Sequence, residues 1–169
     1  ADVVALSPKH PDKVLVNAND RNEKFFDPTL IDLNSGKRER LFKNDGYGNF
    51  IADDDFKLRL ANKPLPDGSS EWFKRSGKSW KLFTKVPQGD GLTTSVIGLT
   101  RDGKTFYMVD SRDRDTAALF AIDLSSAKRT LLHQDPHADV GNVFVDPKTE
   151  VVRAVAVDYL RNEWTVLDP

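Results

Sequence analysis

Apolar and polar residues alternate along much of this chain with the two-residue period of a β-strand. The alternation is clearest in five segments, residues 13–19, 29–33, 105–110, 118–123 and 151–159. Turn-forming residues separate such segments, at 34–36, 67–68, 102–103 and 146–147. No stretch of ten or more residues keeps helical spacing. The pattern predicts an all-β chain of short antiparallel hairpins.

An internal repeat organises the predicted strands. When Lys13 is placed over Lys104, Arg21 meets Arg112, and the same offset brings Ile-Asp-Leu at 31–33 over Ile-Asp-Leu at 122–124 without a gap. The offset of 91 residues is twice the length of about 45 that is typical of a four-stranded propeller blade. The repeat predicts four blade-like units, approximately 1–45, 46–90, 91–136 and 137–169.

Each predicted unit runs from an inner strand through a second and a third strand to a basic outer strand. The fourth unit reaches only its third strand before Pro169. Closed propellers have four to eight blades, because an open set leaves strand edges unpaired. We therefore expect residues 1–169 to form a single partial β-propeller, a fragment of a propeller of seven or eight blades. A closed four-bladed ring is the alternative.

The composition restricts the classes of partner and site. Lys and Arg number 25 against 26 Asp and Glu, so the chain lacks the basic excess that nucleic acid binding requires. No apolar run approaches the roughly 20 residues that span a bilayer. The sequence has no cysteine, which excludes disulfides and thiolate sites. We expect a soluble chain with no nucleic acid partner and no membrane partner.

Catalytic and metal-binding motifs are missing from the sequence. There is no Gly-x-Ser-x-Gly nucleophile elbow. His133 and His137 have Pro136 between them, so they cannot share a helix face as zinc-binding pairs do, and we interpret them as part of an inter-blade loop. The run 53–55 lacks the spacing of a calcium loop and reads as a hairpin turn. We expect no catalytic residue, no metal and no cofactor.

Arginines recur in the loops between the second and third predicted strands. Arg21, Arg112 and Arg161 each precede an Asn or Asp there. In a propeller these loops lie on the same face as the blade-to-blade connections. Two interpretations are open. The arginines pair structurally with Asp113, Asp115 or carbonyl groups of the next blade, or they form a face that meets a peptide carboxylate or a partner domain. The candidate residues of that face are Arg21, Arg112, Asp113, Arg114 and Arg161.

Three tryptophans offer a second candidate surface. Trp72, Trp80 and Trp164 occupy predicted strands or their ends. An aromatic platform for a sugar or peptide is one interpretation of such residues. Packing between blades is the one that we favour, because large aromatic side chains dominate core contacts.

Several motifs resemble a known family. The stretches "LSPKHPDKVLVNANDRN", "DSRDRDTAAL" and "DPHADV" are similar to the N-terminal β-propeller of bacterial serine peptidases of the prolyl oligopeptidase family. The resemblance implies that the propeller caps a separate C-terminal α/β-hydrolase domain, absent from residues 1–169, which carries a Ser-Asp-His triad. It also implies a non-catalytic role, in which the propeller admits only short peptides to that domain. Whether such a protein works in the bacterial periplasm or cytoplasm stays open.

Two other function classes compete with this one. A free-standing propeller that serves as a protein-binding scaffold needs only further blades. A glycosidase propeller has less support, because no pair of carboxylates can be placed across a cleft from the sequence. In either class an open stack of blades exposes edge strands, so we expect the isolated chain to form a homo-oligomer through them.

Overall fold

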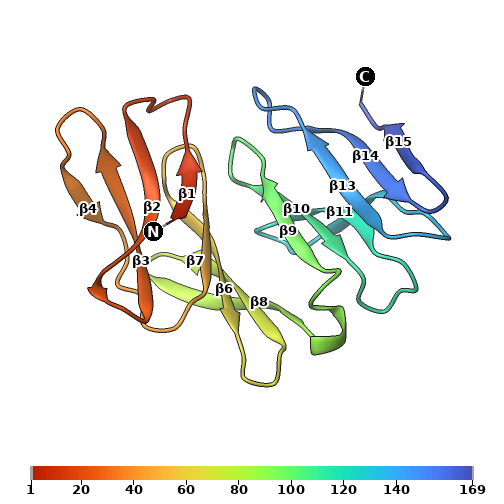
Figure 1. The fold of residues 1–169 in the computed structure, drawn as a ribbon, viewed down its shortest axis with the longest axis horizontal. Helices are drawn as coiled ribbons and strands as arrows, with labels where there is room; N and C mark the ends of the chain where they lie inside the picture. The colour runs from red at the N-terminus through yellow and green to blue at the C-terminus, as the bar shows by residue number, and fades with distance from the viewer. Residues whose placement is uncertain (1, 169) are drawn as a thin grey trace. The chain divides into compact units, whose positions relative to one another are not determined.

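The structure, a computed structural model, describes residues 2–168. These residues form fifteen strands and one short 3-10 turn, Gln88–Asp90. The strands form four antiparallel sheets, in which neighbours along the chain are neighbours in the sheet (Figure 1). No helix within the described residues is long and apolar enough to cross a membrane. We call the four sheets blades 1 to 4 in chain order.

The chain divides into two compact units. Unit 1 contains blades 1 and 2, and unit 2 contains blades 3 and 4. The predicted assignment of all 169 residues to one domain stays a prediction. The strands of unit 1 are β1 (Asp2–Leu6), β2 (Lys13–Asn22), β3 (Phe25–Asp32) and β4 (Arg38–Arg40) in blade 1, and β5 (Asn49–Ala52), β6 (Leu58–Pro64), β7 (Ser70–Ser76) and β8 (Ser79–Val86) in blade 2.

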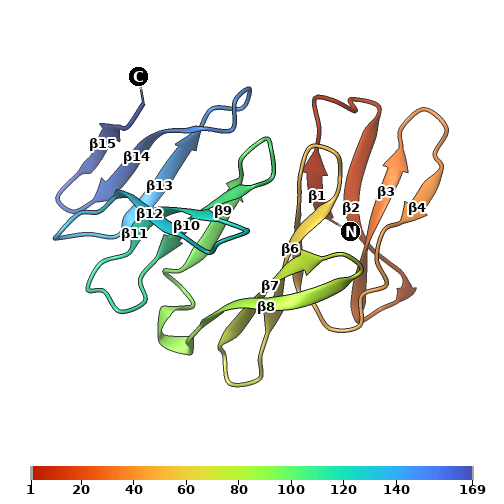
Figure 2. The same ribbon diagram turned by 180° about the vertical axis from the view of Figure 1, so that it is seen from behind.

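Unit 2 repeats this arrangement with one strand fewer. Figure 2 shows its sheets from behind. Blade 4 has three strands, in the order β13-β14-β15, as the sequence predicts for the fourth unit. The strands are β9 (Ser95–Leu99), β10 (Thr105–Asp110), β11 (Ala118–Asp123) and β12 (Arg129–His133) in blade 3, and β13 (Val140–Val145), β14 (Val152–Asp158) and β15 (Asn162–Val166) in blade 4.

Each unit has its own apolar core between its two blades. In unit 1, Leu15 of blade 1 packs in one cluster with Phe50 and Leu58 of blade 2. Trp80 joins this cluster, with its ring centroid 5.6 Å from that of Tyr47. In unit 2 the cluster is aliphatic apart from one tyrosine: Tyr107, Val109, Ala117 and Leu119 of blade 3 and its loop, and Val140, Val152, Val155 and Val157 of blade 4.

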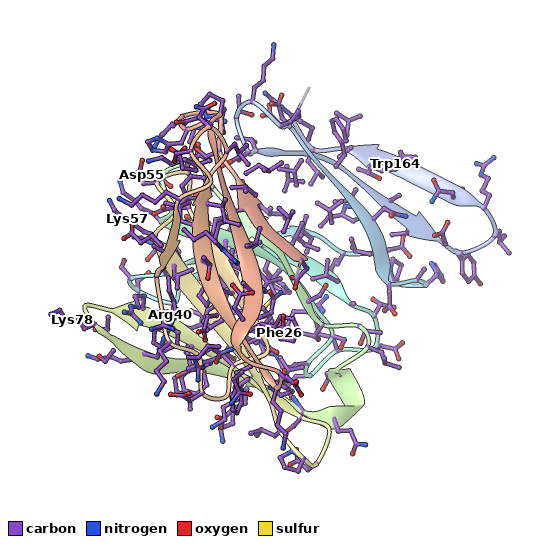
Figure 3. All side chains as sticks on the ribbon, turned by 60° about the vertical axis from the view of Figure 1, so that its left-hand side comes forward. Phe26, Arg40, Asp55, Lys57, Lys78 and Trp164 are labelled. Atoms are coloured by element: carbon purple, nitrogen blue, oxygen red, sulfur yellow. The ribbon has the colours of Figure 1, made fainter. Side chains whose placement is uncertain are left out.

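The predicted packing of tryptophans between blades can be followed for Trp80. Trp80 does contact the core of unit 1. Trp164 on β15 is 53% exposed (Figure 3), and its predicted packing against a further blade stays a prediction. Its side chain lies on the face of blade 4 that is turned away from the core of unit 2, because it pairs with Ala156 while the neighbouring Val155 and Val157 point into that core.

Tight turns after the third strands are held by aspartate side chains. Asp32 accepts hydrogen bonds from the backbone N–H and the hydroxyl of Ser35. The hydrogen bond from the Ser35 hydroxyl is the main cause of the lowered pKa of Asp32. Asp123 in blade 3 accepts the corresponding bonds from Ser125 and Ser126. Gly36 follows with φ of 69°, a conformation that costs glycine little. The repeated Ile-Asp-Leu motif is therefore a turn signal.

The core of unit 1 can be tested by comparing two phenylalanines. Phe50 is 2% exposed, whereas Phe144 on β13 is 53% exposed. We expect Phe50→Ala to lower the free energy of unfolding by about 3–5 kcal/mol, because it leaves a cavity among the rings around it. Phe144→Ala should cost less than about 1 kcal/mol. Urea unfolding followed by tryptophan fluorescence measures both, and equal losses would contradict this assignment of the core.

Candidate functional site

Two aspartates are buried on the sheets of blades 1 and 3, and each meets two guanidinium groups. Asp27 is 3% exposed, and Arg21 donates to both of its carboxylate oxygens, at 2.9 and 3.0 Å. Arg40 of β4 approaches the same carboxylate to 3.5 Å (Figure 3 labels Arg40). Two guanidiniums on one carboxylate supply the charge and the hydrogen bonds that a buried anion requires.

Blade 3 contains a second clamp of the same kind. Asp110 is 0% exposed, and the Nε and Nη2 atoms of Arg112 donate to its two oxygens at 2.8 and 2.6 Å. Arg129 of β12 donates to one of these oxygens at 2.6 Å and also stacks 4.2 Å from the ring centroid of Phe120. We call these two arrangements the aspartate clamps.

The clamps keep both carboxylates ionised. The hydrogen bond from Arg21 is the largest influence on Asp27 and lowers its pKa, and the same bond raises the pKa of Arg21. For Asp110, burial is the largest single influence and would raise the pKa, but the hydrogen bonds from the Arg112 side chain and backbone and the charges of Arg112 and Arg129 together outweigh burial, so the pKa is lowered. Arg112 gains a raised pKa from its hydrogen bond to Asp110.

In each clamp the aspartate stands opposite an alanine on the neighbouring strand, but the two residues have changed places between blades 1 and 3. In blade 1, Ala18 of β2 stands opposite Asp27 of β3. In blade 3, Asp110 of β10 stands opposite Ala118 of β11. The carboxylate thus occupies the equivalent pair in both blades but comes from the third strand in one and from the second strand in the other.

The strand pairing also corrects the ungapped repeat. Asp32 pairs with Lys13, whereas Asp123 pairs with Thr105, not with Lys104 as the constant offset requires. The third strand therefore keeps the offset of 91, while the second strand is displaced by one further residue. The chain that joins Asp110 to Ala118 in blade 3 is one residue shorter than the chain that joins the equivalent pair, Ala18 and Asp27, in blade 1, which residue identity alone does not reveal.

The clamp of blade 1 also fixes the connection between blades 1 and 2. Asn44 is 1% exposed; its backbone N–H donates to Asp27 and its carbonyl accepts from Arg21. The Asn44 side chain donates to the carbonyls of Phe26 and Tyr47 and accepts from two backbone N–H groups, those of Gly46 and Tyr47. A single side chain thus satisfies most of the polar groups of this turn.

The loop after β10 contacts the chain segments on both sides of blade 3. Ser111 donates to Asp90 in the incoming connection at 2.7 Å and bonds with the hydroxyls of Thr93 and Thr94. On the outgoing side, the Thr116 hydroxyl and the backbone N–H of Ala117 donate to the segment 134–139. Within unit 2 the predicted meeting of this loop with the blade-to-blade connections is therefore present.

A shallow hollow of about 490 Å³ lies beside this loop. Arg114 donates to Gln134 and to the carbonyl of Thr116 at its edge. The lining carries three carboxylates against one guanidinium, so a carboxylate ligand finds little net attraction there. The lining residues are Asp113, Arg114, Asp115, Thr116, Gln134, Asp135 and Pro136.

The structure does not give the candidate arginines one common role, and it places Arg21 within strand β2, not in the predicted loop after that strand. Arg21 and Arg112 are held by their own blades' carboxylates, which favours the structural interpretation. The sequence predicted Asp113 or Asp115 as the carboxylate partner of Arg112, and this prediction is wrong. The bidentate partner of Arg112 is Asp110, two residues earlier. Arg161 is different, because 81% of its side chain is exposed in the β14–β15 turn, where it pairs with Glu163.

Sequence reasoning missed the residues that complete the clamps. Asp27, Asp110, Asn44, Arg40 and Arg129 received no role, although an aspartate inside an otherwise apolar strand such as 105–110 is a signal of a buried partner. Within residues 2–168, no three His, Asp or Glu side chains converge as metal ligands do. The ring of His137 lies 5.1 Å from that of Tyr159, which places it in an aromatic contact.

The architecture defines the class of fold as β-propeller blades. TolB of Acinetobacter baumannii matches 100% of this chain and 43% of its own length, with a TM-score of 0.63 and 18% identity. A protein of Agrobacterium tumefaciens described as a TolB matches 96% of this chain and 56% of its own, with a TM-score of 0.60 and 17% identity. The likeness at these identities concerns the fold alone. It confirms the predicted all-β propeller blades.

The proteins that resemble this chain in sequence are peptidases. The chain is 50% identical over its whole length to dipeptidyl aminopeptidase BIII of Pseudoxanthomonas mexicana, and it spans 25% of that protein. It is 22% identical over 89% of its length to dipeptidyl peptidase family member 6 of Caenorhabditis elegans, of which it spans 22%. No protein-family model matches the chain. The chain thus spans about a quarter of these relatives, and its resemblance to the propeller of bacterial peptidases is confirmed.

The exchange of Asp and Ala between strands can be tested in blade 1. We expect Asp27→Ala to lower the free energy of unfolding by about 2–3 kcal/mol, less than for a fully buried pair because Arg21 and Arg40 keep some contact with water. Adding Ala18→Asp should restore part of this loss, since it places the carboxylate where blade 3 has it. Urea unfolding compares the two variants with Ala18→Asp alone. A double variant no more stable than Asp27→Ala would contradict the equivalence of the two positions.

The lowered pKa of Asp110 predicts how stability depends on pH. A carboxylate with a folded-state pKa below its ordinary 3.8 stabilises the fold above that pH, and this stabilisation is lost as pH falls toward the folded value. The free energy of unfolding should therefore fall less steeply for Asp110→Asn than for the unaltered chain between about pH 4 and pH 2.5. Urea unfolding across this range measures the slopes, and parallel curves would contradict an ionised clamp.

Proposed function

We propose that this chain is part of the propeller of a dipeptidyl-peptidase-like serine peptidase, in which it admits short peptides to a separate hydrolase domain and performs no chemistry itself. The observation that carries the proposal is the 50% identity to a dipeptidyl aminopeptidase along the entire chain, with most of that relative lying outside the matched segment. A propeller suits such a role because its loops can restrict access to a neighbouring site while its blades stay rigid.

The contacts of the arginines separate those that hold a blade together from those that can meet a ligand on the face formed by the loops between the second and third strands. The guanidiniums of Arg21 and Arg112 are committed to buried carboxylates, so removing either one would damage the blade before it changed substrate choice. Arg114 at the hollow and Arg161 in the β14–β15 turn have weaker anchors, an amide and an exposed glutamate. We assign contact with a peptide or with the hydrolase domain to these two, together with Asp113 in the lining of the hollow.

The gene that encodes these residues provides the first test. If the reading frame continues into a Gly-x-Ser-x-Gly segment with a later histidine, the peptidase proposal stands. If it ends after a few further blades, the proposal fails and a free-standing protein-binding scaffold replaces it.

The role of the loop face is tested in the whole protein. We expect Arg114→Ala combined with Arg161→Ala to change the ratio of kcat/KM between dipeptide substrates with an acidic and with a neutral side chain by about 5-fold, the effect of roughly 1 kcal/mol from partly solvated charges. Lys148→Ala, which removes an exposed cation from the turn before β14, is the matched control and should leave the ratio unchanged. An unchanged ratio in the double variant would reject a substrate role for this face.

A further inference from the structure

The β7–β8 hairpin of blade 2 holds an arginine in a corner between aromatic rings. The guanidinium of Arg75 lies 5.3 Å from the ring centroid of Phe42 and 4.9 Å from that of Trp80. These two rings meet edge to face, at 84°. The faces of aromatic rings attract a cation in this position. The corner lies within unit 1, where Phe42 belongs to the connection between blades 1 and 2.

The charge of Arg75 is not neutralised by a carboxylate, unlike that of the arginines in the aspartate clamps. Its Nε atom donates to the carbonyl of Gly77 at 3.0 Å, and no ion pair joins it to another of the residues 2–168. The other charges of the hairpin do not compensate either, because residues 70–86 have a net charge of +4. These charges are one carboxylate and five cations: Glu71, Lys74, Arg75, Lys78, Lys81 and Lys85.

Two nitrogen atoms in this corner have no hydrogen-bond acceptor. Nη1 of Arg75 and Nε1 of Trp80 are shielded from solvent, and neither has a partner among the described residues. Both atoms can only donate, so the partner of each must be an acceptor. A buried donor that stays unpaired is costly, and the cost is higher for a charged group. The corner therefore requires an acceptor that residues 2–168 do not supply.

The surroundings favour an anion over a water molecule as this acceptor. A water that accepted from both nitrogens would need acceptors for its own two hydrogens. The rings around Phe42 and Trp80 are those of Tyr47 and Phe50, and only Tyr47 carries an oxygen. Burial raises the pKa of Tyr47 and the charge of Arg75 opposes this rise, which indicates a poorly hydrated site close to the cation. An anion needs no acceptor and also neutralises the guanidinium.

We propose that a small monovalent anion such as chloride binds to Nη1 of Arg75 and Nε1 of Trp80. The ion stabilises the contact between blades 1 and 2, because Phe42 follows the last strand of blade 1 and the hairpin belongs to blade 2. Residues 2–168 already shield both nitrogens, so a side chain from elsewhere in a longer protein reaches them only by opening the aromatic cluster. The site is therefore independent of what precedes or follows this chain.

The dependence of stability on chloride tests the site. Exchanging sodium chloride for sodium gluconate, whose anion is too large for an enclosed site, at a constant ionic strength of about 0.3 M keeps screening unchanged. An ion that binds only the folded chain lowers the unfolding equilibrium constant as its concentration rises. With a dissociation constant of about 10–100 mM, we expect a decrease of about 4- to 30-fold at about 0.3 M chloride, measured by urea unfolding with circular dichroism.

Three variants locate the site within the hairpin. Arg75→Met removes the cation and one donor, and should abolish the dependence on chloride. Trp80→Phe keeps an aromatic ring but removes the second donor, and should weaken chloride binding by about 3- to 10-fold. Lys78→Met is the matched control, because it removes an exposed cation from the turn of the same hairpin (Figure 3 labels Lys78). The control should keep the affinity for chloride within about 2-fold, since an exposed charge is screened by salt.

Two results would overturn the site. Stability of the unaltered chain that does not change with chloride would show that no such ion binds. An equal loss of the dependence in Arg75→Met and Lys78→Met would indicate diffuse attraction to the hairpin.

Crystals soaked in sodium bromide give a readout that does not require the variants to fold. Anomalous scattering from a bromide ion beside both nitrogens would support the site, and its absence there would contradict it. None of these measurements involves peptide cleavage, so their outcome is separate from that of the proposed function.

Discussion

A carboxylate inside a sheet face is tolerated only when cations and hydrogen bonds replace its water, and this requirement shapes both units. Asp27 and Asp110 are nearly or fully buried, and an unpaired charge at either position would cost several kcal/mol. Each is therefore tied to one arginine at or just beyond the end of the second strand, Arg21 in β2 or Arg112 after β10, and to one from the outer strand. In blade 1 the same carboxylate holds the backbone of Asn44. The clamp thus links the second, third and outer strands with the connection that leads to the next blade.

The clamps also determine which residues are available for function. A guanidinium that donates both members of a bidentate pair to its own blade has little capacity left to select a ligand, and this applies to Arg21 and Arg112. Blade 4 has no such clamp around Arg161, whose partner Glu163 is itself exposed. Repeated placement of an arginine at a loop face therefore does not by itself indicate a binding role. In blades 1 and 3 the repeated arginine instead satisfies a buried carboxylate of its own blade.

Local patterns in the sequence were enough to predict several of the strands, and tertiary contacts explain what the patterns could not predict. The segments 105–110 and 118–123 coincide with β10 and β11, because alternation and the flanking turn residues act over short distances. The partner of Arg112 was not predictable in this way, since the choice between Asp110 and Asp113 depends on where the loop backbone turns. Alternation likewise assigns Trp164 to a face of its sheet but does not show whether another blade covers that face.

Blade 1 has alanine on its second strand and the paired aspartate on its third, whereas blade 3 has the aspartate on its second strand and the alanine on its third. This exchange affects how propeller blades should be compared. The requirement in each blade is for one carboxylate and one small residue at a cross-strand pair, and either order satisfies it. An alignment that considers one position at a time finds Asp in one blade and Ala in the other and suggests that neither residue matters. When the two positions are considered together, the pair is the same in both blades. The unit of comparison for such sheets is therefore the cross-strand pair, because the side chains on one face meet across strands and not along them.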